Sequence, residues 1–126
     1  MTQIVSTDEA PAAVGAYSQA TTTGDLLFTS GQLPLTVDGR LLDDAPVDEQ
    51  TRQCLHNVEA ILESAGRSLD DVLKVTAYLD DVDDFEAFDE AYAEFFDTEP
   101  PARSAVGVGA VPKGAAVEIE AVATTE

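Results

Sequence analysis

The stretch PARSAVGVGAVPKGAAVEIEAVA, residues 101–123, is the part of the sequence around which the rest can be arranged. Two runs of small and β-branched residues flank a Pro-Lys-Gly turn, a pattern typical of a β-hairpin. Arg103 lies near the start of the first run, and Glu118 and Glu120 lie inside the second. Charged side chains are unusual among such small apolar residues, so our working hypothesis is that these three form a functional site.

Two segments upstream have the periodicity of amphipathic helices. Apolar residues recur at helical spacing in residues 48–66, where Asp48 suits the N-cap and Gly66 suits the position just after the helix. In the second segment, residues 85–96, the aromatic residues Phe85, Phe88, Tyr92, Phe95 and Phe96 share one face, and the helix must end before Pro100-Pro101. The remaining β-prone segments predict strands at residues 17–23, 26–30 and 72–79, a loop at residues 10–16 and a tight turn at Asp38-Gly39.

These elements predict an α+β domain with about six strands. Each helix is apolar on one side, so we expect both to cover the same face of the sheet. Side chains alternate along a strand, so Glu118 and Glu120 share one side of the last strand, and Arg103 shares a side with Ala105 in the strand before it. The second face is then partly polar and partly lined by very small residues, which predicts a homo-oligomer interface.

The size and composition of the chain fit one globular domain spanning residues 1–126. Its single cysteine, Cys54, has no partner for an internal disulfide, which fits a reducing compartment. The sequence contains neither a recognisable signal peptide nor an apolar run long enough to span a bilayer. We therefore expect a cytoplasmic protein.

The net charge of −19, from 25 acidic and 6 basic residues, excludes several classes of partner. Such a chain repels nucleic acid and anionic membrane surfaces, so we expect neither as a partner. The carboxylates are spread along the whole chain, which favours adaptation to a salty, halophilic cytoplasm; a cation-binding role is the alternative. The sequence has no Cys/His cluster, EF-hand spacing, P-loop or dinucleotide motif, so we expect no metal and no cofactor.

Arg103 heads the list of candidate functional residues, because a guanidinium offers a planar pair of donors that matches a carboxylate. A structural salt bridge is the alternative. Glu118 and Glu120 could act as a base or hold a water, with partial burial raising the pKa, or could both be solvated. Tyr17 follows a small-residue segment and either closes over a pocket or packs.

Ser30 and Gly31 end a strand where backbone groups could approach a ligand. No His or Asp constellation accompanies Ser30, which argues against a hydrolase triad. The single histidine, His56, lies on the polar side of the first helix and is interpreted as a surface residue. Cys54 borders the apolar stripe and is interpreted as a core residue.

Taken together, these motifs resemble the RidA (YjgF) family of reactive-intermediate deaminases, and the resemblance covers essentially the whole chain. The signature segments are Pro101-Ala102-Arg103-Ser104, Val111-Pro112-Lys113 and Glu118-Ile119-Glu120-Ala121. Further matches are the segment from Ala10 to Tyr17, the segment Thr29-Ser30-Gly31-Gln32, the pairs Asn57-Val58 and Asp84-Phe85, and Tyr92.

The resemblance implies a chorismate-mutase-like fold, a mixed six-stranded sheet with two helices on one face, assembled as a homotrimer with ligand clefts between neighbours. It implies hydrolysis of 2-imino acids (2-iminobutanoate and 2-iminopropanoate) to 2-keto acids and ammonia, without cofactor or metal. Arg103 would bind the substrate carboxylate. Glu118 would activate the water, with the backbone carbonyl of Ala105 assisting, and Tyr17 would orient the substrate, with Ser30 and Gly31 nearby.

Three positions depart from the family pattern. Ala16 stands where the family often has a proline, which favours a less rigid Tyr17 loop. Ala105 stands where many members have a cysteine, which excludes thiol chemistry. Asp89 stands where many have an asparagine, which either alters the polarity near the cleft or reflects the acidic bias of the chain. The alternative to an enzyme is a sensor that binds a small carboxylate, or a chaperone-like protein of the same fold. A ribonuclease role, also attributed to relatives, conflicts with the charge of −19.

Overall fold

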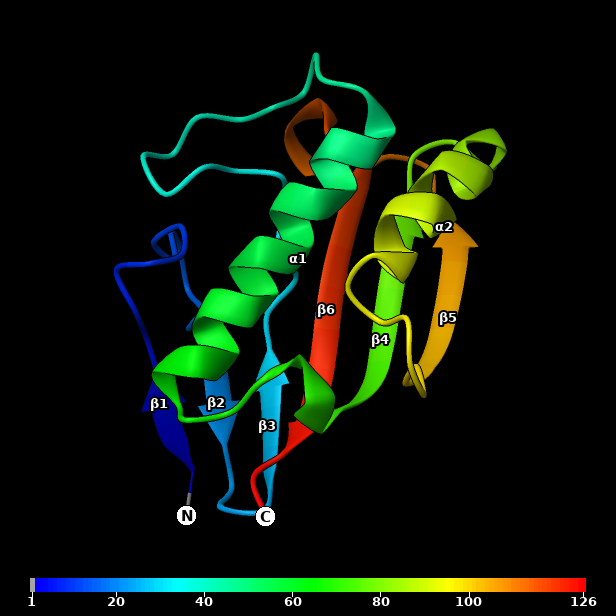
Figure 1. Cartoon of the computed structure of the whole chain (residues 1–126). Coiled ribbons are helices and arrows are strands. Elements are labelled where there is room, and N and C mark those ends of the chain that lie inside the picture. The colour runs from blue at the N-terminus through cyan, green and yellow to red at the C-terminus, as the bar shows by residue number, and fades with distance from the viewer. Residues whose placement is uncertain (1) are drawn as a thin grey trace.

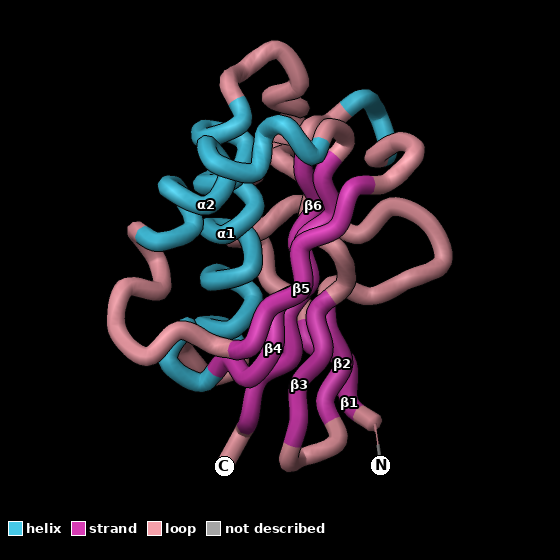
Figure 2. Tube along the Cα trace, turned by 90° about the vertical axis from the view of Figure 1, so that its right-hand side faces the viewer, coloured by secondary structure: helices cyan, strands magenta, loops and turns pink. Residues whose placement is uncertain are grey.

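A six-stranded mixed sheet forms one layer of the protein, and two helices cover one of its faces (Figures 1 and 2). The computed structural model describes residues 2–126. The strands are β1 Gln3–Val5, β2 Ala20–Thr22, β3 Leu26–Thr29, β4 Val72–Leu79, β5 Ala102–Gly107 and β6 Val117–Thr124. The α-helices are α1 Val47–Ser64 and α2 Phe85–Ala93, and the short 3-10 turns are η1 Leu69–Asp71, η2 Val82–Asp84 and η3 Pro112–Gly114.

The strand order β1-β2-β3-β6-β4-β5 contradicts the predicted hairpin over residues 101–123. β4 lies between β5 and β6, pairing in parallel with β5 and antiparallel with β6. The prediction failed because residue pattern identifies β-prone runs but not their partners. A parallel pair needs a crossover connection, and α2 supplies it between β4 and β5. The Pro-Lys-Gly turn does exist as η3, with positive φ at Lys113 and Gly114, but it leads the chain back across β4.

Both predicted helices form, and they lie side by side on the same face of the sheet as expected (Figure 2). α1 begins at Val47, so Asp48 lies in its first turn, and Pro46 occupies the N-cap position predicted for Asp48. Gly66 follows the C-cap with φ of 75°, which confirms its role in ending the helix. The side chains that α1 buries against the sheet include Cys54, Leu55, Val58, Ile61 and Leu62.

The side chains of β6 alternate strictly between the two faces of the sheet. Val117, Ile119, Ala121 and Ala123 are buried on the helix side, whereas the intervening side chains are only partly buried. Glu118 and Glu120 therefore lie on the face that the helices do not cover. β1 was not predicted, because three residues are too few to show an alternating pattern.

Buried amides of α1 hold the long connection from β3 to α1 against the end of the sheet. Asn57 donates from Nδ2 to the carbonyl of Leu35 at 2.9 Å, and Gln50 donates from Nε2 to the carbonyl of Ala45 at 2.8 Å. The turn predicted at Asp38-Gly39 is present within this connection, with φ of 88° at Gly39. Within residues 2–126, no helix is long and apolar enough to cross a membrane.

Candidate functional site

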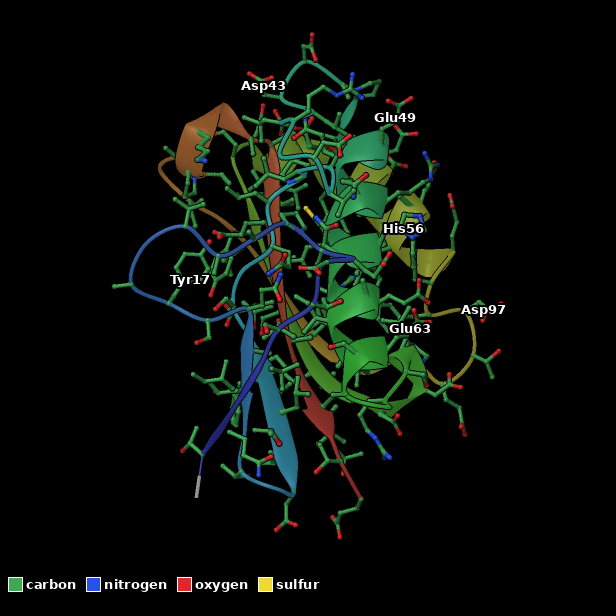
Figure 3. All side chains as sticks on the ribbon, turned by 90° about the vertical axis from the view of Figure 1, so that its left-hand side faces the viewer. Tyr17, Asp43, Glu49, His56, Glu63 and Asp97 are labelled. Carbon is green, nitrogen blue, oxygen red and sulfur yellow. The ribbon has the colours of Figure 1, made fainter. Side chains whose placement is uncertain are left out.

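A pocket of about 330 Å³ opens on the face of the sheet that the helices leave uncovered. It brings together three of the predicted site residues, Tyr17, Gly31 and Glu118. Its other lining residues are Pro11, Ala12, Gln19, Gln32, Leu33, Leu35 and Pro112. Tyr17 lies in a loop on the opposite side of the sheet from α1, as Figure 3 shows.

Gly31 lies against Glu118 because the segment after β3 pairs with β6. The backbone N–H of Gln32 donates to the carbonyl of Ile119 at 2.7 Å, and the N–H of Ile119 donates back at 3.1 Å. A Cβ atom on Gly31 would lie 2.5 Å from Oε2 of Glu118. The missing side chain of Gly31 is therefore the space that the Glu118 carboxylate occupies.

The surroundings of Glu118 favour its protonated form. Partial burial raises the pKa of Glu118 above its ordinary value, and the neighbouring Glu120 carboxylate raises it further. Glu120 accepts a hydrogen bond from Oη of Tyr78 at 3.2 Å, whereas no hydrogen-bond partner of the Glu118 carboxylate lies among residues 2–126. A carboxylate of raised pKa that faces a pocket is a stronger base than an ordinary carboxylate and is suited to accept a proton from water.

The loop that carries Tyr17 is held by a buried glutamine. Gln19 donates from Nε2 to the carbonyl of Pro11 at 2.8 Å, and its Oε1 accepts from the N–H of Thr7 at 2.7 Å. The Tyr17 side chain itself is about half exposed, and its Oη accepts a hydrogen bond from the N–H of Val14 at 3.3 Å. Tyr17 therefore borders the pocket without being locked in the core.

Ser30 is placed differently from its neighbour Gly31. Its Oγ donates a hydrogen bond to the carbonyl of Ser18 at 2.6 Å, which ties the end of β3 to the Tyr17 loop. The side chain of Ser30 is not among those that line the pocket. The hydroxyl is thus engaged in positioning the loop, and any contact with a ligand would have to come from the backbone.

Arg103 lies on the other face of the sheet, in a cage of aromatic rings from α2. Its Nη1 donates to Oδ1 of Asp89 at 2.7 Å. Its guanidinium carbon lies 4.7 Å from the ring centre of Tyr92, 5.4 Å from that of Phe85 and 5.5 Å from that of Phe88. Such contacts fix the orientation of a guanidinium while leaving its outer N–H groups free to bind a ligand.

The register of the sheet shows why Arg103 and Glu118 do not meet within one chain. Arg103 pairs with Val75 of β4, and Glu118 pairs with Tyr78 of the same strand. Residues at odd spacing on a strand point to opposite faces, so the three charges of residues 101–123 do not form one cluster. Ala105 shares the helix-side face with Arg103 and packs against the core.

Two contacts of Arg103 were not predicted from the sequence, namely those with the aromatic rings of α2 and with Asp89. The aromatic stripe of α2 was recognised, but its role as a cage for Arg103 was not. Asp89 was considered for its effect on polarity near the cleft, but not as the partner of Arg103. Their common signal is spacing, because residues 85, 88, 89 and 92 share one helical face. Among residues 2–126, no group of three or more His, Cys, Asp or Glu side chains is arranged to hold a metal ion.

The chain is similar in sequence and in fold to known proteins. The family model described as Endoribonuclease L-PSP matches residues 7–125. A RutC family protein of Pyrococcus horikoshii is 46% identical over 126 residues, covering 100% of both chains. The crystal structure of the YjgF gene product of E. coli has a TM-score of 0.93 at 39% identity, covering 98% of this chain and 99% of that one. The structure of E. coli TdcF with bound serine has a TM-score of 0.93 at 40% identity, with the same coverage.

Proposed function

Because the chain belongs to the Endoribonuclease L-PSP family, which includes the YjgF and RutC proteins, we propose that it hydrolyses reactive 2-imino acids to 2-keto acids and ammonia. The substrates in this proposal are 2-iminobutanoate and 2-iminopropanoate. The observation that carries it is the pocket that Tyr17 and Glu118 both line, in which the Glu118 carboxylate, with a raised pKa, occupies the space left by the side-chain-free Gly31.

In this proposal Arg103 binds the substrate carboxylate, and Glu118 acts on water. The water oxygen bonds to C2 of the protonated imine while Glu118 accepts a water proton. Glu118 then gives that proton to the nitrogen, the C2–N bond breaks, and ammonia leaves. The hydroxyl gives its proton back to the Glu118 carboxylate as the C2=O bond of the keto acid forms. The imine carbon is already electrophilic once protonated, so orientation and one base are enough chemistry.

The site in this proposal needs two copies of the chain, because Arg103 and Glu118 lie on opposite faces of one sheet. A homotrimer, as the resemblance to RidA proteins implies, would bring Arg103 of one subunit toward the Glu118 pocket of its neighbour. The uncovered sheet face supports this arrangement. It carries the exposed side chain of Val106 beside partly buried polar residues, among them Tyr78 and Glu120, which is unusual for a wholly solvated surface.

A second candidate function is binding without turnover. The TdcF structure contains serine, which is an amino acid and has no imine to hydrolyse. A sensor of small carboxylates would use Arg103 in the same way and would be stabilised by its ligand. Ribonuclease activity, which the family description suggests, is disfavoured by the net charge of −19, because binding to a phosphate backbone needs positive charge.

The deciding experiment couples the protein to a serine or threonine dehydratase that releases the imino acid. Semicarbazide traps the remaining imine, and its product is followed over time in high salt. The protein should accelerate loss of the imine, and Arg103→Ala should abolish the acceleration. Absence of acceleration by the unaltered protein contradicts the deaminase proposal. Ligand-induced stabilisation that still requires Arg103 would then favour the sensor.

A further inference from the structure

Arg103 is already paired with a carboxylate of its own chain. The contact from Nη1 to Oδ1 of Asp89 is 2.7 Å, and the Arg103 side chain is 24% exposed. Asp89 belongs to α2, whose aromatic side chains hold the guanidinium from the sides. The Asp89 side chain is 49% exposed, so the aromatic rings orient the guanidinium while the carboxylate stays open to solvent and to a ligand.

This pairing changes what the guanidinium offers to a ligand. An arginine side chain has five N–H donors, and within residues 2–126 its side-chain hydrogen bond is the one to Asp89. The other donors can still hold a carboxylate in the planar geometry that suits it. The positive charge, however, is balanced by Asp89, so the pair as a whole gives little net attraction for a simple anion.

We propose that Asp89 makes the Arg103 site selective for ligands that carry a cationic nitrogen next to their carboxylate. In such a ligand the carboxylate binds the free donors of Arg103. The nitrogen, attached to the adjacent carbon, then lies near Asp89 and is attracted by it. A 2-oxo acid has the same carboxylate but no cation, so Asp89 repels it without compensation. Asp89 is in this sense a specificity-determining residue.

The inference rests on the proposed function in one respect, namely that Arg103 binds the ligand carboxylate. Its consequence for the reaction is a distinction between substrate and product. The protonated imino acid has both charges, whereas the 2-keto acid that remains after ammonia has left has only the negative one. Asp89 therefore favours binding of the substrate and release of the product.

The test compares two ligands of similar size, 2-aminobutanoate and 2-oxobutanoate, by isothermal titration at fixed salt. The ratio of their dissociation constants is measured for the unaltered protein and for Asp89→Asn. Glu90→Gln is the matched control, because it removes the same charge from the adjacent, exposed position of α2. We expect Asp89→Asn to shift the ratio about tenfold toward 2-oxobutanoate, and Glu90→Gln to leave it within about twofold.

The outcomes separate this inference from the deaminase proposal. A purely structural role of Asp89 changes both dissociation constants alike and leaves the ratio unchanged, which would overturn the inference even if imine hydrolysis is observed. An equal shift in Glu90→Gln would assign the effect to bulk charge and would also overturn it. Failure of the unaltered protein to bind either ligand would also overturn the inference. If the ratio shifts as expected but no hydrolysis occurs, the inference stands and the deaminase proposal falls.

Discussion

Arg103 and Glu118 lie on opposite faces of the same sheet, although they come from the same short stretch of sequence. β4 separates their strands, and the register pairs Arg103 with Val75 and Glu118 with Tyr78. A reaction that uses both side chains therefore has to be completed by a second copy of the chain. This relationship can be tested without a structure of the assembly.

The first prediction concerns complementation between two inactive variants. Arg103→Ala and Glu118→Gln should each be inactive in the imine assay when assembled alone. In mixed oligomers some sites receive Arg103 from one subunit and Glu118 from the other, and both are then intact. Random assembly of equal amounts into closed trimers should restore about a quarter of the sites. The measurement is the initial rate after joint unfolding and refolding of the two variants.

The control for complementation is the double variant, which carries both substitutions on one chain. Mixed with unaltered protein, it should leave about a quarter of the sites intact, because both residues must come from unaltered neighbours. Persistent inactivity of the mixed single variants, with oligomers of normal size, would show that both residues act from the same subunit or that one is not required.

The second prediction concerns Gly31→Ala. The new Cβ would approach Oε2 of Glu118 to 2.5 Å, so the carboxylate has to move out of its position in the pocket. We expect kcat/KM to fall about tenfold or more, because small displacements of a catalytic group are costly. The melting temperature should change little, since the displaced atoms end a flexible side chain. Gly109→Ala is the control, because a Cβ there meets no atom within 4 Å.

The third prediction concerns the acidic limb of the pH–rate profile. Burial, and second to it the charge of Glu120, raises the pKa of Glu118. As a general base Glu118 must be ionised, so kcat/KM falls when the pH drops through this raised pKa. Glu120→Gln removes the second cause and should move the acidic limb to lower pH. An unmoved limb would mean that another group is titrating.

The fourth prediction concerns stability at two pH values. Because folding raises the pKa of Glu118, stability falls as the pH rises from the pKa of an unfolded glutamate to the raised folded-state pKa, and the full cost remains above it. Glu118→Gln cannot ionise, so it should melt at a higher temperature than the unaltered protein at neutral pH. Below the pKa of an unfolded glutamate, both states of the unaltered protein are protonated, and the difference should disappear. Scanning calorimetry at both pH values is the measurement.

The fifth prediction concerns Gln50, a buried amide of α1. Its Nε2 donates to the carbonyl of Ala45, and its Oε1 accepts from the N–H of Ala116, each at 2.8 Å. Gln50→Ala leaves partly buried backbone groups without these partners, so the free energy of unfolding in urea should fall by about 1–3 kcal/mol. Gln53→Ala, which removes one partly exposed bond to Asn57, should cost less. Equal losses would show that Gln50 acts only through helix propensity.

The sequence allowed the layers of the fold to be predicted but not the order of the strands. Periodicity placed α1 almost to the residue, because apolar side chains such as Leu55 and Leu62 recur over several turns. The pairing of β5 with β4 could not be derived in this way, since small apolar residues fit many neighbours. β1 consists of three residues and offered no pattern at all.

The sequence suggested candidate residues for the site but not how they are arranged in space. Glu118 and Glu120 were not distinguishable by composition, and the resemblance to RidA proteins favoured Glu118. The structure places Glu118 against Gly31 in the pocket and gives Glu120 a hydrogen bond from Tyr78. The pairing of Arg103 with Asp89 depends on the crossover through α2, which only the folded chain brings beside β5.

The alternation along β6 also limits how this protein can vary in length. A shift of β6 by one residue would turn Ile119 toward the pocket and bury the carboxylates of Glu118 and Glu120 in the core, where ionised groups are not tolerated. An insertion or deletion between β5 and β6 therefore cannot be absorbed by sliding the strand. Within this connection, length changes can be accepted only as loops that leave the register of β6 with β4 unchanged.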